Sequence, residues 1–133
     1  MKLVILKNKK GIKGIFAGNN VSNTLELISP IYEFKPAYLE NPTRTSIQFK
    51  DKHFEDDIGQ YINHNCSPNT VVTTLNSTGP IVLVPIKDIS KDEEITIDYN
   101  DTEDKLSHPF KCDCHGKLIK GRNQNEKNDN TRN

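Results

Sequence analysis

The chain has 133 residues with a formal net charge of zero, and only 33% of its residues are hydrophobic. This length fits one domain with a core of modest size. The 18 basic residues are balanced by 18 acidic ones, which argues against a direct nucleic-acid partner, because such proteins carry a basic excess on one face. No apolar run approaches the ~20 residues that cross a bilayer, and the N-terminal run is too short for a signal peptide. We therefore expect an intracellular protein without a membrane partner, either a monomer or a small homo-oligomer.

Short strands separated by turn residues are predicted along most of the chain, and no segment predicts a convincing amphipathic helix. The continuous apolar run at residues 81–84 is typical of a buried strand. Pro85 ends this run or places it at a sheet edge. The proline-containing segment 30–44 is expected to be irregular, with room for one helical turn. The pattern predicts a mostly-β single domain. The expected strands are residues 3–6, 14–17, 25–28, 46–49, 71–74, 81–84 and 95–99.

Two unusual strings follow this pattern at a fixed distance from each other. Residues 63–69 read Asn-His-Asn-Cys-Ser-Pro-Asn, and residues 92–100 read Asp-Glu-Glu-Ile-Thr-Ile-Asp-Tyr-Asn. Alone, the first is a polar turn and the second is an acidic turn leading into a strand. Together they resemble the Asn-His-x-Cys-x-Pro-Asn and Glu-Glu-x-Thr-x-Asp-Tyr motifs of the SET-domain protein lysine methyltransferases, in the same order and spacing.

The resemblance implies a specific fold and domain organisation. SET domains are mostly β, with several small curved sheets packed around a C-terminal pseudoknot that brings the two motifs together. We expect the SET domain at residues 1–107 and a degenerate post-SET lid at residues 108–121. Residues 122–133 are expected to form a disordered polar tail, because they contain no aliphatic or aromatic residue that would offset the entropy of ordering.

The family's chemistry is methyl transfer from S-adenosylmethionine to the side-chain amine of a protein lysine by SN2 displacement. Because the methyl donor already carries an excellent leaving group, the protein contributes mainly positioning and electrostatics. Tyr99 is the candidate catalytic residue and a candidate cofactor contact. Asn63 and His64 resemble the residues that hold the cofactor. Taken alone, Tyr99 would be an ordinary half-buried tyrosine and His64 a histidine that caps a turn.

A third segment of the chain resembles the family's N-terminal cofactor-binding strand. Residues 11–17 read Gly-Ile-Lys-Gly-Ile-Phe-Ala, and the resemblance assigns Lys13, Gly14 and Phe16 to cofactor binding. Glycine lets the backbone approach a ligand closely, although a lone Gly-x-x-Gly is more often a plain turn. Phe110, in the expected lid, would stack on the edge of the adenine.

Cysteine usage indicates a possible metal site. Cys66 lies in the first motif, and Cys112 and Cys114 resemble the start of the post-SET zinc motif. The third post-SET cysteine is missing, whereas structural zinc takes four ligands. His115 or His108 would be the replacement, with three metal-free cysteines as the alternative.

On the substrate side, the insert that usually recognises the peptide is very short. Tyr61 and Ile97 are the expected residues of the lysine channel, and Ile97 stands where the family commonly carries Phe or Tyr. Ring faces and apolar walls suit the stem and ammonium of lysine. The other aromatic residues available for such a channel, or for an ordinary core, are Tyr32, Phe34 and Tyr38.

Two other classes of function remain open at this level. The eroded zinc motif and the short insert favour an inactive SET-fold binding module, whereas intact Asn63, His64 and Tyr99 argue against it. A small metal-binding structural protein would use the three cysteines and a histidine. The partner expected for the enzyme is a histone or another protein that carries the target lysine.

Overall fold

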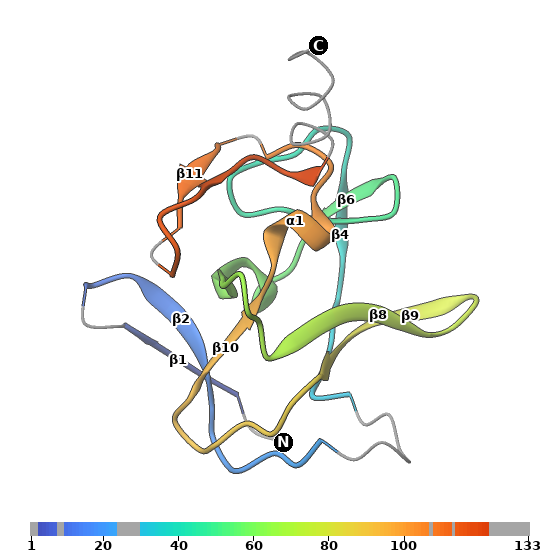
Figure 1. Cartoon of the computed structure of the whole chain (residues 1–133). Coiled ribbons are helices and arrows are strands. Elements are labelled where there is room, and N and C mark those ends of the chain that lie inside the picture. Colours follow the sequence, from blue (N-terminus) through green and yellow to red (C-terminus); the bar gives the residue numbers. More distant parts are fainter. Residues whose placement is uncertain (1–2, 8–9, 24–29, 107, 113, 123–133) are drawn as a thin grey trace.

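The computed structural model describes residues 3–7, 10–23, 30–106, 108–112 and 114–122. Within these residues the fold consists of four small β-sheets (Figure 1). The mostly-β prediction is confirmed. The strand orders are β1-β2-β10-β7, β3-β9-β8, β4-β6-β5 and β11-β12. The strands are β1 Leu3–Lys7, β2 Lys13–Ala17, β3 Tyr32–Glu33, β4 Ala37–Leu39, β5 Ile47–Phe49, β6 Lys52–Glu55, β7 Asn63–His64, β8 Thr70–Asn76, β9 Gly79–Pro85, β10 Glu94–Ile97, β11 Phe110–Lys111 and β12 Leu118–Ile119.

The four-stranded sheet brings the two sequence motifs side by side. Strand β10 pairs antiparallel with β2 on one side and parallel with β7 on the other. The register places Thr96 opposite Asn63 and Ile97 opposite His64. Asn69 fixes this arrangement, because its side-chain oxygen accepts the Thr96 N–H at 2.9 Å and its side-chain nitrogen donates to the Glu94 carbonyl at 2.8 Å. The first motif is therefore tied to the second by side-chain and backbone hydrogen bonds.

One hydrophobic core joins three of the sheets. Ile15 and Ile95 come from the four-stranded sheet, Leu83 comes from β9 and Phe54 comes from β6, and all four are fully buried. Phe34 packs edge-on against Phe54, with ring centroids 5.6 Å apart. Because alternate residues of a strand point to opposite faces, Ile95 and Ile97 share the core side of β10.

The predicted strands agree with the structure in six of the seven segments, with different ends. The segment 25–28 lies outside the described residues, and the segment 95–99 ends earlier, at Ile97. There Asp98 caps the helical turn α1 (Tyr99–Thr102), and its side chain accepts the Asn100 N–H at 2.9 Å. The expectation that residues 30–44 are irregular was wrong, because the short strands β3 and β4 lie within them.

The C-terminal segment docks beside α1. The Arg122 side chain donates to the Asp104 carboxylate at 2.8 Å, and its backbone N–H donates to the Glu103 carbonyl at 3.1 Å. Gly121 has a φ of +100°, and a Cβ at this position would lie 2.7 Å from the Asp104 carbonyl oxygen. Glycine is therefore required at residue 121 for this close approach. The predicted disordered tail begins at Arg122, and the rest of it lies outside the described residues.

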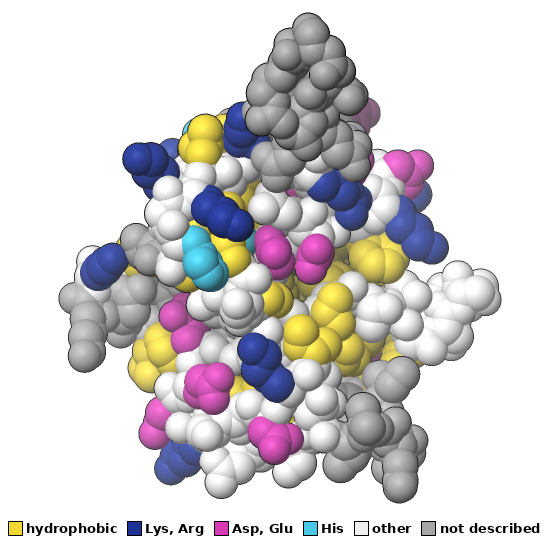
Figure 2. Space-filling model, viewed as in Figure 1, with side chains coloured by type: hydrophobic (Ala, Val, Ile, Leu, Met, Phe, Trp, Pro, Cys, Tyr) yellow, Lys and Arg dark blue, Asp and Glu magenta, His cyan; other side chains and the backbone are white. Residues whose placement is uncertain are grey.

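Charged side chains of both signs are interspersed over the face that Figure 2 shows. This distribution agrees with the balanced composition of the chain. No helix in the described part of the chain has the length and apolar character needed to cross a lipid bilayer.

Candidate functional site

Tyr99 stands where the two motifs meet, and it is held at both ends. Its backbone N–H donates to Nδ1 of His64 at 3.0 Å, and its hydroxyl donates to the Ile62 carbonyl at 2.6 Å. Removal of the phenol from solvent raises the pKa of Tyr99, and the nearby carboxylates of Glu103 and Glu94 raise it further. The phenol is therefore neutral at physiological pH. Because its proton is already donated, its oxygen can only accept a further hydrogen bond.

Asn63 has both of its amide hydrogens committed. Its Nδ2 atom donates to the Lys13 carbonyl at 2.9 Å and to Oε2 of Glu94 at 2.8 Å. The amide oxygen of Asn63 therefore remains as an acceptor for a ligand. Glu94 fixes this orientation from β10, and sequence reasoning treated Glu94 only as part of the motif.

Two clefts of about 470 Å³ each adjoin Tyr99. Volumes of this order are typical of small-molecule sites. Among the described residues, the first cleft is lined by the cationic side chains of Lys13 and Arg44 and by no carboxylate. The second contains Glu94 and His64. The residues that line both clefts are Ile12, Asn63, Tyr99 and Phe110.

A smaller cavity of about 30 Å³ lies next to the first cleft. Its apolar walls include Ile62 and Ile97, and its polar walls include Thr102 and Glu103. The residues that line both this cavity and the first cleft are Arg44, Thr45, Gln60, Tyr99 and Leu106. Tyr99 therefore lies at the junction between a ligand-sized cleft and a narrow space with both apolar and polar walls.

Phe110 joins the C-terminal segment to the site. Its ring centroid lies 5.8 Å from that of Tyr99 and 5.9 Å from that of His64, and both contacts are edge-on. Strand β11 carries Phe110 and pairs with β12, so that Phe110 lies opposite the buried Ile119. The aromatic contact predicted from the C-terminal segment thus lies beside Tyr99.

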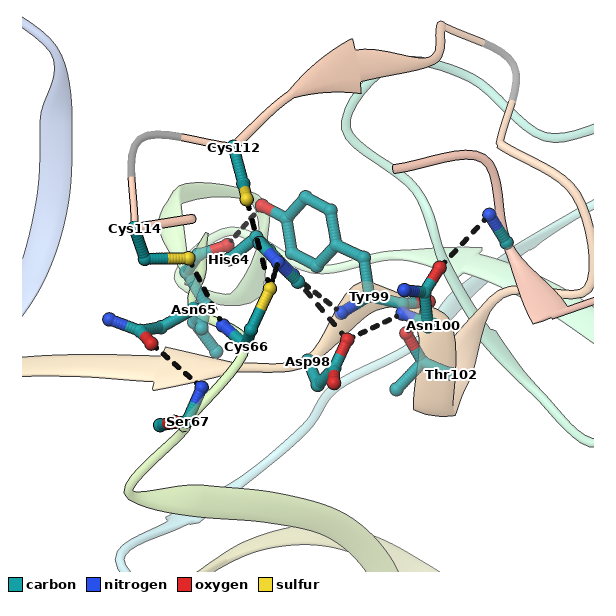
Figure 3. Close-up of polar contacts among 12 residues, drawn as sticks. His64, Asn65, Cys66, Ser67, Asp98, Tyr99, Asn100, Thr102, Cys112 and Cys114 are labelled. Carbon is teal, nitrogen blue, oxygen red and sulfur yellow. Dashed lines mark hydrogen bonds and ion pairs between the residues drawn. The ribbon is translucent and has the colours of Figure 1, made fainter. Parts of the chain in front are cut away.

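A group of thiols lies beside this aromatic cluster (Figure 3). The ligand atoms of His64, Cys66, Cys112 and Cys114 all lie within 4.8 Å of one another. The sulfurs of Cys66 and Cys112 are 3.7 Å apart, near the ~3.8 Å edge of a tetrahedron with zinc–sulfur bonds of ~2.3 Å. Three thiols in this arrangement fit a zinc ion. His108 and His115, the expected replacements for the missing cysteine, are exposed and are not in the group.

The position of the ring proton determines whether His64 can coordinate a metal in this group. Burial lowers the pKa of His64, so its ring is neutral at pH 7. Nδ1 accepts the Tyr99 N–H, so the proton of a neutral ring is on Nε2. Nε2 lies 3.2 Å from the sulfur of Cys66. In this tautomer His64 donates to the sulfur and does not offer a lone pair to a metal.

The structure brings most of the predicted site residues together. The first cleft is lined by Lys13, Tyr61, Asn63, Tyr99 and Phe110, and His64 lines the second. Ile97 lines the small cavity.

Other predicted residues lie elsewhere. Gly14 and Phe16 are on β2 and line neither cleft. Tyr32 donates its hydroxyl to Asp56, Phe34 is in the core, and Tyr38 is 59% exposed. These three aromatic residues therefore do not line the cavity beside Tyr99.

Sequence reasoning missed Arg44, Glu94 and Glu103. The expected strand end at Tyr99 concealed that the chain turns back there and carries Glu103 to the cavity wall.

Comparison with known proteins finds relatives that match part of the chain. Two relatives are the human "Histone-lysine N-methyltransferase 2D", 41% identical over 57 residues, and the Emericella nidulans "Histone-lysine N-methyltransferase, H3 lysine-4 specific", 35% identical over 66 residues. The alignments cover 41% and 44% of this chain, but only 1% and 5% of those proteins. The chain thus corresponds to a small part of each relative.

Solved structures share the fold. A crystal structure of KRYPTONITE in complex with mCHG DNA and SAH has a TM-score of 0.67 at 18% identity, covering 89% of this chain and 29% of that chain. A second KRYPTONITE structure, with mCHH DNA, an H3(1-15) peptide and SAH, has a TM-score of 0.66 at 17% identity and the same coverage. The sequence model of the SET domain matches residues 6–100, well over half of the chain. The resemblance seen in the two motifs is confirmed, and the chain belongs to the SET-domain family.

Proposed function

We propose that the protein transfers a methyl group from S-adenosylmethionine to the side-chain amine of a protein lysine. The observation that carries this proposal is the position of Tyr99 between a ligand-sized cleft and a narrow cavity. The names of the histone-lysine methyltransferase relatives support the reaction, and the SAH in the titles of the KRYPTONITE structures supports the cofactor.

The cleft residues fit the charges of the cofactor. Its carboxylate suits the cationic wall made by Lys13 and Arg44. Its ammonium suits the amide oxygen of Asn63, the acceptor that Glu94 leaves available. Phe110 offers a ring for the adenine, as in the sequence-based expectation. When bound, S-adenosylmethionine supplies an activated methyl group on a sulfonium sulfur.

Tyr99 orients the amine of the target lysine. Since its hydroxyl proton is donated to the Ile62 carbonyl, its oxygen accepts an N–H from the amine. This hydrogen bond would leave the nitrogen lone pair directed away from Tyr99. The apolar side chains of Ile62 and Ile97 exclude water from the alkyl stem. An amine held in this way would be free to displace the sulfonium in line, in an SN2 reaction.

The partner is a protein that carries the target lysine, and histone H3 is the first candidate because of the relatives' names. The test is transfer of an isotopically labelled methyl group to recombinant histone H3, to assembled histone octamers and to the proteins of a cell extract. Label on lysine is the expected result. If no protein is labelled although calorimetry shows cofactor binding, the inactive binding module is the correct description. Absence of cofactor binding as well would favour the structural metal protein.

Replacing Gly14 by alanine is expected to weaken S-adenosylmethionine binding by about fivefold or more. A Cβ at this position would overlap Oε2 of Glu94 and would lie 3.0 Å from Nδ2 of Asn63. The two side chains would have to separate, and a buried hydrogen bond typically contributes ~1 kcal/mol or more. Calorimetric Kd values for the wild type and the variant measure the effect. A variant Kd equal to that of the wild type would contradict the assignment.

The thiol group is proposed to hold zinc that joins the C-terminal segment to the first motif. Cys66, Cys112 and Cys114 are the ligands, and His64 supports Cys66 by an N–H···S hydrogen bond. Because Cys114 is exposed, solvent can take the fourth position. This site differs from the four-cysteine motif that the resemblance implied.

Cobalt(II) titration tests the metal proposal. One equivalent is expected to bind, with the sulfur-to-metal charge-transfer bands of a thiolate site. Cys112→Ser should lower the affinity by at least about tenfold, the lower end of the loss expected when a metal site is disrupted, whereas His64→Ala should retain the charge-transfer bands. If His64→Ala loses binding as completely as Cys112→Ser, the ring is itself a ligand. Failure of the wild type to bind would remove the metal from the proposal.

A further inference from the structure

Glu103 is a buried carboxylic acid beside the reacting end of the site, and the two sequence motifs do not include it. It directly follows α1, is 4% exposed and lines the small cavity together with Tyr99. We propose that Glu103 accepts the proton of the target lysine through a water molecule in this cavity. The inference rests on the proposed methyl transfer and adds a residue to it.

The chemistry requires such an acceptor. A lysine side chain has an ordinary pKa of ~10.4, so it arrives as an ammonium ion without a lone pair. Each methyl transfer forms one N–C bond and breaks one C–S bond, whose electron pair remains on sulfur. One proton must leave the nitrogen for each turnover. In the proposed route this proton passes to water, then to the Glu103 carboxylate, and finally to bulk solvent.

The cavity is suited to one relay water. Its volume of about 30 Å³ exceeds the ~10–15 Å³ that a water molecule needs. Its walls combine the apolar side chains of Ile62 and Ile97 with polar ones, among them Tyr99 and Glu103. The other polar residues of the lining are Thr43, Arg44, Thr45, Ser46, Gln60 and Thr102. The polar residues of the lining offer a water molecule hydrogen-bond partners, and the Tyr99 phenol and the Glu103 carboxylate are two of them. A water molecule between these two groups would connect the amine held by Tyr99 to the carboxylate.

The Glu103 carboxylate keeps free acceptor positions for a hydrogen bond from the relay water. Its Oε2 atom accepts the backbone N–H of Gln48 at 2.7 Å. A carboxylate offers about four lone-pair positions, so this bond fixes the side chain and does not saturate it. The bond also ties β5 to the end of α1. A purely structural role for Glu103 is the alternative that the experiment must separate.

The surroundings make Glu103 a stronger base than an exposed carboxylate. Burial raises its pKa, whereas hydrogen bonds from Gln48 and Thr102 and the nearby His53 on β6 lower it, and Asp104 raises it. The net shift is upward. The other charged or titratable groups that face it are Tyr99, which is neutral, and Arg44 on the cavity wall. Arg122 contacts the Glu103 carbonyl and directs its charge to Asp104.

The first experiment is the pH profile of kcat for Glu103→Gln, with histone H3 as acceptor. Glutamine retains an oxygen for the Gln48 N–H, so the fold and the cofactor Kd should be unchanged. We expect kcat to fall by about 10²-fold near pH 7, the lower range for loss of a general base. The deficit should shrink about tenfold per pH unit as solvent deprotonates the lysine, so it should vanish near about pH 9, below the lysine pKa of ~10.4. Glu33→Gln, on the exposed β3 strand, is the matched control and should keep the wild-type profile.

The second experiment needs no substrate. Titration of the Glu103 side-chain carboxyl by ¹³C NMR, assigned with the Glu103→Gln variant, should give a pKa above the ~4.3 of an ordinary glutamate. A value at or below this reference would overturn the proposal. A deficit in Glu103→Gln that is the same at every pH would also overturn it, since a structural defect has no reason to disappear at high pH. Absence of transfer by the wild type to any protein would instead reject the proposed function.

Discussion

Tyr99→Phe is expected to lower kcat by about 10²–10³-fold, the loss that follows removal of one positioned group at a reacting centre. The variant keeps the ring and its edge-on contact with Phe110. It loses the hydroxyl oxygen that accepts from the lysine amine and the bond to the Ile62 carbonyl. Steady-state kinetics with saturating cofactor measure kcat, and calorimetry should show little change in the cofactor Kd.

A matched control separates this effect from a general loss of tyrosine hydroxyls. Tyr38→Phe removes a hydroxyl from a side chain that is 59% exposed and lines neither the clefts nor the small cavity. Its kcat should equal that of the wild type. If Tyr99→Phe also retained wild-type turnover, Tyr99 would be an ordinary buried tyrosine, and the mechanism proposed for it would be wrong.

The sequence predicted the part of the fold in which long apolar patterns occur. The strands at residues 71–74 and 81–84 were found because they belong to seven-residue strands with strong alternation or continuous burial. Strands β3 and β4 have two and three residues, too few to show a period of two. Their pairing is set by β9 and β6, which are distant in sequence. The threading of the C-terminal pseudoknot stays a prediction.

The helical turn at Tyr99 has a local sequence signal in the residue that precedes it. Asp98 is a preferred N-cap residue, and its side chain caps α1 as the residue type suggests. The apolar alternation through Ile97 favoured a strand that continued to Tyr99. In the structure the strand ends at Ile97 and the Asp98 cap starts the helical turn. This turn directs the chain back toward the cavity and gives Glu103 its position.

The sequence predicts the site residues that lie inside the two motifs. It does not predict those that reach the site only through tertiary contacts. Asn63 and Tyr99 lie in motifs whose spacing can be recognised in the sequence. The place of His64 beside the thiols depends on the parallel pairing of β7 with β10, which also directs Nδ1 to the Tyr99 N–H. No sequence pattern indicates which ring nitrogen of a histidine accepts a hydrogen bond in the folded protein. The expected fourth ligands, His108 and His115, were chosen by proximity in sequence alone.

The product of the reaction is expected to go beyond monomethyl-lysine, to the dimethyl or trimethyl state. Ile97 is 2% exposed and lines the cavity of about 30 Å³ beside Tyr99. Its side chain has no hydroxyl that would hold a water molecule where a further methyl group must fit. Residue 97 therefore adds no second water to the relay water proposed between Tyr99 and Glu103 in this cavity. Mass spectrometry of the product with excess cofactor determines the methylation state.

Two substitutions at Ile97 separate the effect of volume from that of a bound water. Ile97→Tyr should restrict the product to monomethyl-lysine, because its ring fills the cavity and its hydroxyl anchors water. Ile97→Phe fills the same space without a hydroxyl, so it should retain dimethylation. We expect the second methyl transfer to slow by about tenfold or more in the tyrosine variant, which corresponds to ~1.4 kcal/mol in the barrier. A wild type that stops at monomethyl-lysine, with no change in Ile97→Tyr, would show that residue 97 does not set the product.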